Sequence, residues 1–328
     1  MILAGDIGGT KSVLGVYSPE AGIESPLAQA KFQTAAYDGL EAMVTEFLSG
    51  LDVTIEKAVF GVGGTVKAGR ATFTNLPFSV DREALKSVLK IPQVILLNDL
   101  EATAWSLPSL GVNDLYTLNK GERVEGGTMA VLAPGTGLGE AYLTWEGSSY
   151  QARASEGGHA DFAPASQLEI ELLSYLLKRY PHVSYERVCS GIGIPDIYAF
   201  LKARGHAPES AWLADELAEA QDPTPLIVKG ALSQERPCPL CAATLEIFIS
   251  ALGAEAGNLA LKVMATGGLY LAGGIPPRIL PLLNAGRFMQ SYLNKGRMSS
   301  LLARIPVQVM VAPDSAIRGA AWYGLQRF

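Results

Sequence analysis

The sequence predicts an α/β protein with two domains, and three observations lead to this expectation. Short apolar runs with strand-like composition alternate with helical periodicity along the whole chain. The chain has 328 residues, which is long enough for two domains, each with a buried core. A strand–turn–strand pattern with a Gly/Thr-rich turn occurs at residues 3–17 and again, less closely matched, at residues 131–143.

The first half of the chain alternates between strands and helices. Runs rich in β-branched and other apolar residues predict strands at Ile2–Ile7, Ser12–Tyr17, Ala28–Thr34, Lys57–Val62, Ala71–Asn75 and Gln93–Leu97. Apolar residues at helical spacing predict helices at Gly39–Leu48, Asp81–Leu89 and Leu100–Leu107. The connection around Pro108–Asp114 is the least periodic and is the expected domain boundary.

The second half repeats this mixture with more helix. Strands are expected at Met129–Ala133, Glu140–Thr144, Leu269–Ala272 and Val307–Val311. Helices are expected at Gln167–Arg179, Pro195–Lys202, Ala211–Ala218, Leu240–Met264 and Ser315–Gln326.

Composition and charge exclude several classes of protein. The net charge of −6 argues against a nucleic-acid partner. The first basic residue, Lys11, follows Asp6, so no secretory signal is expected. The most apolar stretch, Ala242–Ile275, is interrupted by charged residues and is never uncharged for the ~18 residues of a membrane span. Three cysteines form no disulfide framework. We therefore expect a cytoplasmic protein with no membrane partner.

The stretch GDIGGTKS at residues 5–12 looks at first like a Walker A phosphate loop. A P-loop has glycine directly before its lysine and leads into a helix, whose N-terminus faces the phosphates. Here Thr10 precedes Lys11, and Ser12–Tyr17 has strand composition. The residues therefore predict a tight turn between two strands rather than a P-loop.

Three glycine-rich turns follow apolar runs, at Gly8–Thr10, Gly135–Gly137 and Gly273–Gly274. Turns that expose successive backbone N–H groups can bind phosphate oxygens. Two such turns in two halves of a protein could hold one polyphosphate from opposite sides. Ordinary β-hairpins are the alternative interpretation of each turn taken alone.

Asp99 lies after the apolar run Gln93–Leu97 and before an expected helix. Ligands bind at the carboxyl ends of strands in open α/β sheets, so this carboxylate is a candidate catalytic group. A helix N-cap is the alternative role, since aspartate is common at that position.

Eight motifs in order along the chain resemble the bacterial-type glucokinases of the hexokinase and actin superfamily. They are GDIGGT (5–10), TNLPF (74–78), LLNDLEATAWSL (96–107), APGTGLGEAYL (133–143), SEGGHADFAP (155–164), YERVCSGIGIPDIY (185–198), LAGGIPPRIL (271–280) and KGRM with IPVQVMVAPDSAIRGAA (295–321). The resemblance implies an actin-like, ribonuclease H-like fold with an interdomain cleft. The small domain would comprise residues 1–110 and 313–328, and the large domain, with most sugar and adenosine contacts, residues 111–312.

The resemblance also implies the reaction, which is phosphorylation of glucose at its 6-hydroxyl by ATP. Asp99 would be the general base that takes the proton of the attacking hydroxyl. The implied sugar ligands are Asn75, Asn98, Asp99, Glu156, His159 and Glu186. Carboxylates, carboxamides and imidazoles suit this role because each sugar hydroxyl both donates and accepts hydrogen bonds.

The resemblance implies ATP contacts in the three glycine-rich turns and in the strand before the first of them. The residues concerned are Gly5, Asp6, Ile7, Gly8, Gly9, Thr10, Gly135, Thr136, Gly137, Gly273 and Gly274. Asp6 would hold Mg²⁺ through water, since this ion keeps much of its hydration shell. A homodimer is implied by the resemblance alone.

Two alternatives stay open. Lys11 after GDIGGT is more typical of the ROK family of sugar kinases and repressors, so a ROK-type kinase for another hexose or an amino sugar is possible. The only CxxC, Cys238–Cys241, lacks a second pair to complete a zinc site, and no DNA-binding helix-turn-helix precedes the first strand. A non-catalytic hexose sensor is the second alternative, although Asp99 is present.

Overall fold

The computed structural model describes residues 1–73 and 78–326. Within them the chain forms two compact units. Unit 1 comprises Met1–Val112, Ser148–Ala154 and Ala312–Phe328, and unit 2 comprises Asn113–Gly147 and Ser155–Val311. Asn75, a candidate sugar ligand, lies outside the described residues.

Unit 1 is built on a sheet with the strand order β3-β2-β1-β4-β8. Its strands are β1 (Ile2–Ile7), β2 (Lys11–Tyr17), β3 (Ala28–Gln33), β4 (Lys57–Val62) and β8 (Gln93–Asn98). β1 and β2 form an antiparallel hairpin, as do β2 and β3, whereas β4 is parallel to both β1 and β8. The carboxyl ends of β1, β4 and β8 therefore lie at one edge of the sheet.

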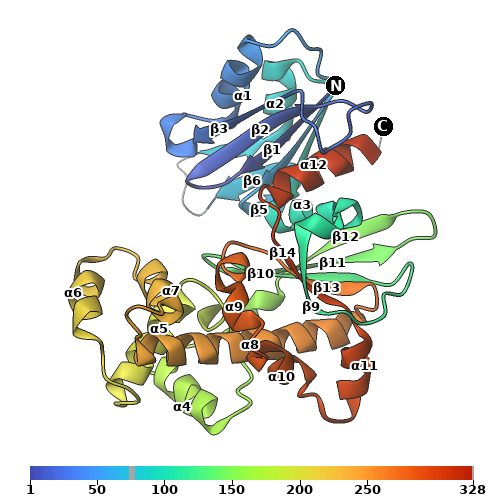
Figure 1. The fold of residues 1–328 in the computed structure, drawn as a ribbon. Coiled ribbons are helices and arrows are strands. Elements are labelled where there is room, and N and C mark those ends of the chain that lie inside the picture. Colours follow the sequence, from blue (N-terminus) through green and yellow to red (C-terminus); the bar gives the residue numbers. More distant parts are fainter. Residues whose placement is uncertain (74–77, 327–328) are drawn as a thin grey trace. The chain divides into compact units, whose positions relative to one another are not determined.

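Alternate side chains of β1 enter separate cores on the two faces of this sheet, as the pleat of a strand requires. Leu3 and Ile7 pack with the helices α1 (Leu40–Ser49) and α2 (Arg82–Leu89). Ala4 packs with α3 (Asp99–Ser106) and α12 (Ser315–Gln326). Figure 1 shows α1 and α2 on one face of the sheet and α3 and α12 on the other. Asp6, two residues after Ala4, belongs to the face covered by α3 and α12.

A second, smaller sheet in unit 1 has the order β5-β6-β7. Its strands are β5 (Gly64–Lys67), β6 (Arg70–Phe73) and β7 (Ser79–Asp81). α2 starts directly after β7, and the Asp81 carboxylate caps it by accepting from the N–H groups of Glu83 and Ala84.

Unit 2 repeats the same arrangement of strands. The six-stranded sheet has the order β12-β11-β10-β13-β14-β9, and all of it except most of β12 belongs to unit 2. Its strands are β9 (Leu115–Asn119), β10 (Met129–Pro134), β11 (Leu138–Trp145), β12 (Tyr150–Ser155), β13 (Gly268–Leu271) and β14 (Val307–Met310). β10 and β11 form an antiparallel hairpin and β13 is parallel to β10 and β14, which is the pattern of β1, β2, β4 and β8.

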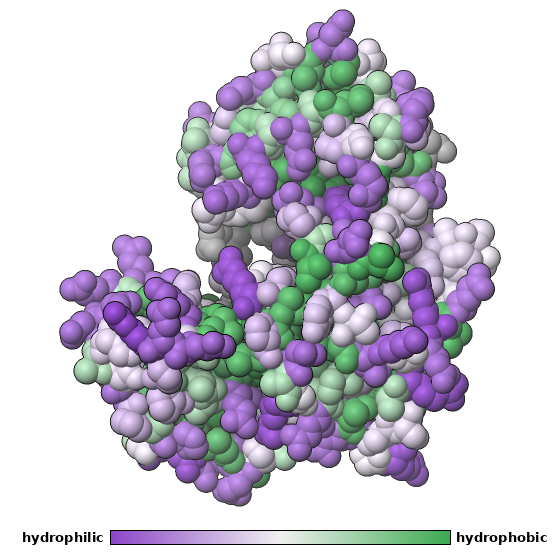
Figure 2. Space-filling model, in the orientation of Figure 1, coloured by the Kyte–Doolittle hydropathy of each residue, from purple (hydrophilic) through white to green (hydrophobic). Residues whose placement is uncertain are grey.

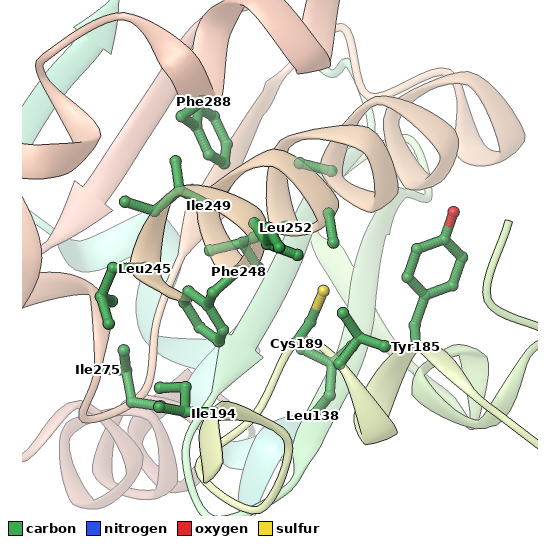
Figure 3. Close-up of a cluster of buried hydrophobic side chains, with 14 of the residues drawn as sticks. Leu138, Tyr185, Cys189, Ile194, Leu245, Phe248, Ile249, Leu252, Ile275 and Phe288 are labelled. Atoms are coloured by element: carbon green, nitrogen blue, oxygen red, sulfur yellow. The ribbon is translucent and has the colours of Figure 1, made fainter. Parts of the chain in front are cut away.

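The helices of unit 2 surround α8 (Pro239–Val263), which belongs to its main hydrophobic core. The other α-helices are α4 (Gln167–Leu176), α5 (Gly193–Ala203), α6 (Ala211–Glu219), α7 (Thr224–Leu232), α9 (Leu280–Leu283), α10 (Arg287–Leu293) and α11 (Ser299–Arg304). Figure 3 shows Phe248, Leu252 and Ile249 of α8 among residues from β11, α5 and α10. This core supports the loops at the carboxyl ends of β10 and β13.

Helix α8 is long and apolar enough to cross a membrane by length and composition alone, but 83% of its apolar window is buried inside the protein. The core helix of a globular unit meets the same criterion. On the face shown in Figure 2, hydrophilic side chains cover much of each unit, and hydrophobic ones appear in scattered groups.

Within the described residues, the expected strands and helices have counterparts, and the differences concern short or polar segments. The last two residues of the strand expected at Ala71–Asn75 lie outside the described residues. Strands β5, β7, β9 and β12 and helices α7, α10 and α11 were not expected. The helix expected at Gln167–Arg179 ends earlier, at Leu176, and the one expected at Pro195–Lys202 begins earlier, at Gly193. The three cysteines are free and buried.

Candidate active site

The turn between β1 and β2 is tight and rigidly held. The N–H of Gly8 donates to the carbonyl of Lys11 at 3.2 Å, which closes the turn. Thr34, after β3, donates its hydroxyl to the carbonyl of Gly8 at 2.8 Å and its N–H to the carbonyl of Thr10 at 3.0 Å. Gly9 and Thr10 are exposed at the tip. The turn therefore presents fixed backbone groups to solvent, as a phosphate site requires.

Gly5 and Ile7 are part of the core of unit 1. A Cβ on Gly5 would lie 2.6 Å from the Phe60 ring, so only glycine fits there. The Ile7 side chain is fully buried, and its carbonyl accepts from the N–H of Gly63 at 2.9 Å. Any contact of these two residues with a nucleotide would therefore use backbone atoms.

Asp6 lies beside two other carboxylates. Burial, and then the charges of Asp99 and Asp314, raise the pKa of Asp6 to about 7. Asp99 begins α3 and Asp314 lies directly before α12. Among residues 1–73 and 78–326, no group of three or more His, Cys, Asp or Glu side chains is close enough to hold a metal ion directly. The acidic surroundings of Asp6 still suit a hydrated cation, which would offset the repulsion.

Asn98, rather than Asp99, supplies the main cap of α3. Its Oδ1 accepts from the N–H of Leu100 at 3.0 Å and of Glu101 at 3.4 Å, and its Nδ2 donates to the carbonyl of Gly64 at 3.1 Å. These contacts use most of the hydrogen-bonding capacity of the Asn98 amide.

Asp99 is therefore not needed as the cap, although its Oδ1 also accepts from the Leu100 N–H at 2.8 Å. The residue is exposed to solvent, yet the protein atoms around it remove enough water to raise the pKa of its carboxyl group. Hydrogen bonds from the start of α3 oppose this shift. Asp99 is thus a solvent-accessible carboxylate that is a stronger base than an ordinary aspartate.

In unit 2, the turn Gly135–Gly137 links β10 to β11. The N–H of Gly135 donates to the carbonyl of Gly137 at 2.8 Å. The N–H groups of Gly191 and Ile192, before α5, donate to the carbonyls of Gly135 at 2.7 Å and Thr136 at 3.3 Å. The turn is therefore fixed from within and from a neighbouring loop, as its counterpart in unit 1 is.

Glu156, His159 and Glu186 come together in unit 2 beside this turn. Nε2 of His159 lies 3.9 Å from Oε2 of Glu156, and Nδ1 lies 3.9 Å from Oε1 of Glu186. The other oxygen of Glu186, Oε2, accepts from the N–H of Leu138 at 3.0 Å. The Glu156 and His159 side chains are exposed, and Glu186 is 22% exposed. Polar groups with free hydrogen-bonding capacity thus converge next to a candidate phosphate turn.

A large cavity lies within unit 2 and connects two of the glycine-rich turns. Its volume is about 1390 Å³, and its lining includes Gly135, Thr136 and Gly274. Gly273 has a φ of +82°, and a Cβ there would lie 2.5 Å from the carbonyl of Pro134, so this turn requires glycine. The remaining walls come mainly from residues 191–196, 221–235 and 274–278. The cavity exceeds the roughly 300–1,000 Å³ of an ordinary ligand pocket.

Sequence reasoning missed several residues around these sites. Asp314 and Glu140 both lie inside the quoted motifs, and a lone acidic residue in an otherwise apolar run was the available signal. Nothing in the sequence of residues 221–235 indicated that they line a cavity, because their position there depends on the fold rather than on a local pattern.

Comparison with known proteins agrees with this fold and these motifs. A family model described as Glucokinase matches residues 3–327. A glucokinase of Nostoc punctiforme is 40% identical over 334 residues, covering 98% of each chain. The crystal structure of a glucokinase from an Antarctic psychrotroph has a TM-score of 0.83 at 32% identity, covering 98% of each chain.

A more distant structure shares the fold alone. A ROK family glucokinase from Streptomyces griseus, solved in complex with glucose and AMPPNP, has a TM-score of 0.63 at 19% identity, covering 98% of this chain and 97% of that one. The expected α/β fold of the actin-like sugar kinases is confirmed by these similarities. The family match spans nearly the whole chain and the relatives are similar over their full length, so this chain belongs to the glucokinase family.

Proposed function

We propose that this protein transfers the γ-phosphoryl group of ATP to the 6-hydroxyl of D-glucose, with Asp99 as general base. Membership of the glucokinase family supports the reaction. The observation that carries the assignment of the site is the convergence of Glu156, His159 and Glu186 beside the Gly135–Gly137 turn. These three side chains can bind sugar hydroxyls, and they lie next to a backbone turn that can bind phosphate.

Glucose would be bound by the polar cluster of unit 2 together with Asn98 and Asp99 of unit 1, and by Asn75. Carboxylates that accept from sugar hydroxyls give strong, directional hydrogen bonds, and a hydroxyl left unpaired in such a site costs about 1–3 kcal/mol. A site of this kind distinguishes sugars by the orientation of single hydroxyls. Asn98 retains little free hydrogen-bonding capacity, so its contribution includes the orientation of Asp99.

ATP would be held by the glycine-rich turns at Gly8–Thr10 and Gly135–Gly137, with Gly273 and Gly274 against the adenosine. Gly5, Asp6 and Ile7 extend the first turn into β1. The large cavity of unit 2 supports this placement because Gly135, Thr136 and Gly274 all line it.

We infer that Mg²⁺ accompanies ATP and is bound by Asp6 through water. The bound ion would neutralise charge on the phosphates as the phosphoryl group transfers. The carboxylate donor and the repulsion that Asp6 experiences from Asp99 and Asp314 fit a hydrated divalent cation.

The protein's own part in the chemistry is positioning and a single proton transfer. Asp99 accepts the proton of the attacking hydroxyl, and its raised pKa makes it a better base than a fully solvated carboxylate. The N–H groups at the start of α3 fix its orientation. Exclusion of water matters too, since water would consume ATP without product.

We propose a cytoplasmic enzyme of glycolysis that acts as a homodimer, with no nucleic-acid or membrane partner. The three free cysteines support the cytoplasmic location, and the net charge of −6 supports the absence of a nucleic-acid partner. We also propose that residues 1–110 and 313–328 form the small domain and residues 111–312 the large one.

A coupled ADP-release assay with Mg²⁺ and ATP tests this function. It is run with glucose, mannose, galactose, fructose and N-acetylglucosamine. Turnover selective for glucose is the expected result. Turnover of another hexose or an amino sugar would favour a ROK-type specificity, for which Lys11 is the motivating residue. No turnover, with a glucose-dependent rise in Tm, would favour a hexose sensor and contradict the proposed enzyme.

A further inference from the structure

Two carboxyl groups are buried in the core of unit 2, and one of them, Glu140, lies against the turn that carries Glu156 and His159. Glu140 of β11 is 2% exposed, and Glu255 of α8 is fully buried. Oε1 of each is buried and accepts no hydrogen bond from the residues that the structure describes. Two buried carboxyl groups close to each other are stable when one proton is shared between them, because two adjacent negative charges in a low-dielectric site repel strongly.

Glu255, the second carboxyl group, contacts a hydrogen-bond donor and a cation. Its Oε2 accepts from Nδ2 of Asn258 at 2.8 Å, and its Oε1 lies 3.5 Å from the Lys262 ammonium. Nζ of Lys295 in turn donates to Oδ1 of Asn258 at 2.7 Å, which orients the amide. Donors and cations thus gather on Glu255, and the proton belongs to Glu140. Burial and the Glu255 charge raise the pKa of Glu140 to about 8, against an opposing effect of Lys262.

Glu140 lies directly against the sugar-side turn. A Cβ added to Gly157 would be only 1.9 Å from Oε2 of Glu140. A Cβ on Gly158 would be 2.1 Å from the carbonyl of Leu138, on the same strand as Glu140. The turn Gly157–His159 therefore rests on β11 with no spare room. A shift of the Glu140 carboxyl group toward Gly157 would therefore displace the turn.

The same network reaches the second element of the sugar cluster. Nδ2 of Asn258 lies 3.0 Å from the hydroxyl of Tyr185, to which it donates. Figure 3 shows the Tyr185 ring beside α8. Tyr185 directly precedes Glu186. The segment that carries Glu186 is therefore connected to Glu255 through Asn258, and the Glu156–His159 turn contacts Glu140.

We propose that Glu140 and Glu255 share one proton and that this acid–carboxylate pair positions the Glu156–His159 turn for glucose. The proposal rests on the proposed function. Glu140 is a positioning residue, since Gly157 and Gly158 separate it from the sugar cluster. Loss of the shared proton places two negative charges together beneath the turn, and glucose affinity falls.

Glu140 is the group of this cluster that titrates just above neutral pH. The titratable and charged groups around the pair are Lys262 of α8, Lys295 after α10, Tyr185, and Cys189 before α5. The charge of Glu169 of α4 acts on Cys189. Burial, together with nearby carboxylates, raises the pKa of the Cys189 thiol and of the Tyr185 hydroxyl well above their usual values. Both therefore stay neutral where Glu140 ionises.

Calorimetric titration of glucose without nucleotide, between pH 7 and 9.5, tests the proposal. This range begins above the ordinary histidine pKa of about 6.5. If only the protonated pair binds, the apparent Kd of the wild-type protein rises about tenfold by pH 9. Glu140→Gln keeps the shape and a donor but cannot ionise, so its Kd is expected near the wild-type value at pH 7 and constant above it. Glu169→Gln, a buried carboxylate without contact to the turn, is the matched control and should keep the alkaline rise.

Glu255→Gln is a second variant, which serves if Glu140→Gln does not fold. It removes the charge that holds the proton on Glu140, so the rise in Kd should move to lower pH. A wild-type Kd that does not change with pH, an equal rise in Glu140→Gln, or an unmoved midpoint in Glu255→Gln would each contradict the proposal. If the wild-type protein binds no glucose at any pH, the proposed function itself fails. The two failures are therefore distinguishable.

Discussion

Glu186 accepts a hydrogen bond from the backbone N–H of Leu138 at 3.0 Å. Leu138 is the first residue after the Gly135–Gly137 turn, so this bond links a candidate sugar ligand to a candidate phosphate turn. The other Glu186 oxygen faces His159 at 3.9 Å. One carboxylate thus links the candidate sugar ligand His159 to the candidate phosphate turn within unit 2.

Glu186→Gln should weaken glucose binding while preserving this link. The amide oxygen can still accept from Leu138, but a neutral acceptor binds a sugar hydroxyl less tightly than a carboxylate. We expect the glucose Kd to rise about tenfold. Calorimetry measures the change. Glu209→Gln is the control, because Glu209 is bound by Tyr198 and Lys202 and lies outside the cluster. An unchanged Kd in Glu186→Gln would remove Glu186 from the sugar site.

Gly137→Ala should damage glucose binding through Glu186. An added Cβ at Gly137 would lie 2.4 Å from Oε2 of Glu186 and would displace it. Gly135→Ala adds the same atom two residues away, where nothing lies within 4 Å. We therefore expect Gly137→Ala to raise the glucose Kd by about tenfold or more and Gly135→Ala to leave it unchanged. Equal glucose affinities in the two variants would show that the contact between Gly137 and Glu186 does not matter.

The stability of the protein should depend on pH through Glu140. Its pKa is about 8 in the folded protein, above the ordinary glutamate value of 4.5. Between these values the unfolded chain releases a proton that the folded protein keeps, so the free energy of unfolding falls as pH rises through this window. Glu140→Gln avoids that loss.

Thermal denaturation at pH 5 and pH 8.5 measures this effect. The Tm of Glu140→Gln relative to wild type should be higher at pH 8.5 than at pH 5 by several degrees or more, because a pKa raised from 4.5 to about 8 corresponds to about 4 kcal/mol between these two pH values. Glu209→Gln again serves as control. A difference in Tm that is the same at both pH values would mean that Glu140 is ionised in the folded protein.

Sequence patterns predicted the central parts of the fold because those parts have strong local signals. β1 and β4 are short, almost continuous apolar runs, and the structure has them at the expected bounds, Ile2–Ile7 and Lys57–Val62. β12 was not expected because its sequence, YQARAS, has no apolar alternation. α7 contains proline, glycine and β-branched residues, which all weaken the helical signal.

The sequence indicated individual residues of the candidate site but not how they are arranged relative to one another. The motif around Asp99 identified a carboxylate at a strand end, but the division of roles between Asn98 as cap and Asp99 as free carboxylate required the structure. The Glu140–Glu255 pair joins β11 to α8, far apart in the sequence, and no local pattern indicates such a contact. Tertiary pairings of this kind depend on how whole elements pack.

The most direct test of the account is the effect of Asp99→Asn on catalysis and on glucose binding measured separately. Asp81→Asn is the matched control, because Asp81 also lies at the start of a helix and asparagine can replace it as a cap. If Asp99 is the general base, Asp99→Asn should lower kcat by about 10²–10⁴-fold with little change in the glucose Kd, and Asp81→Asn should leave kcat unchanged. A glucose Kd that rises as much as kcat/KM falls would mean that Asp99 only binds the sugar, and an unchanged kcat would contradict its role altogether.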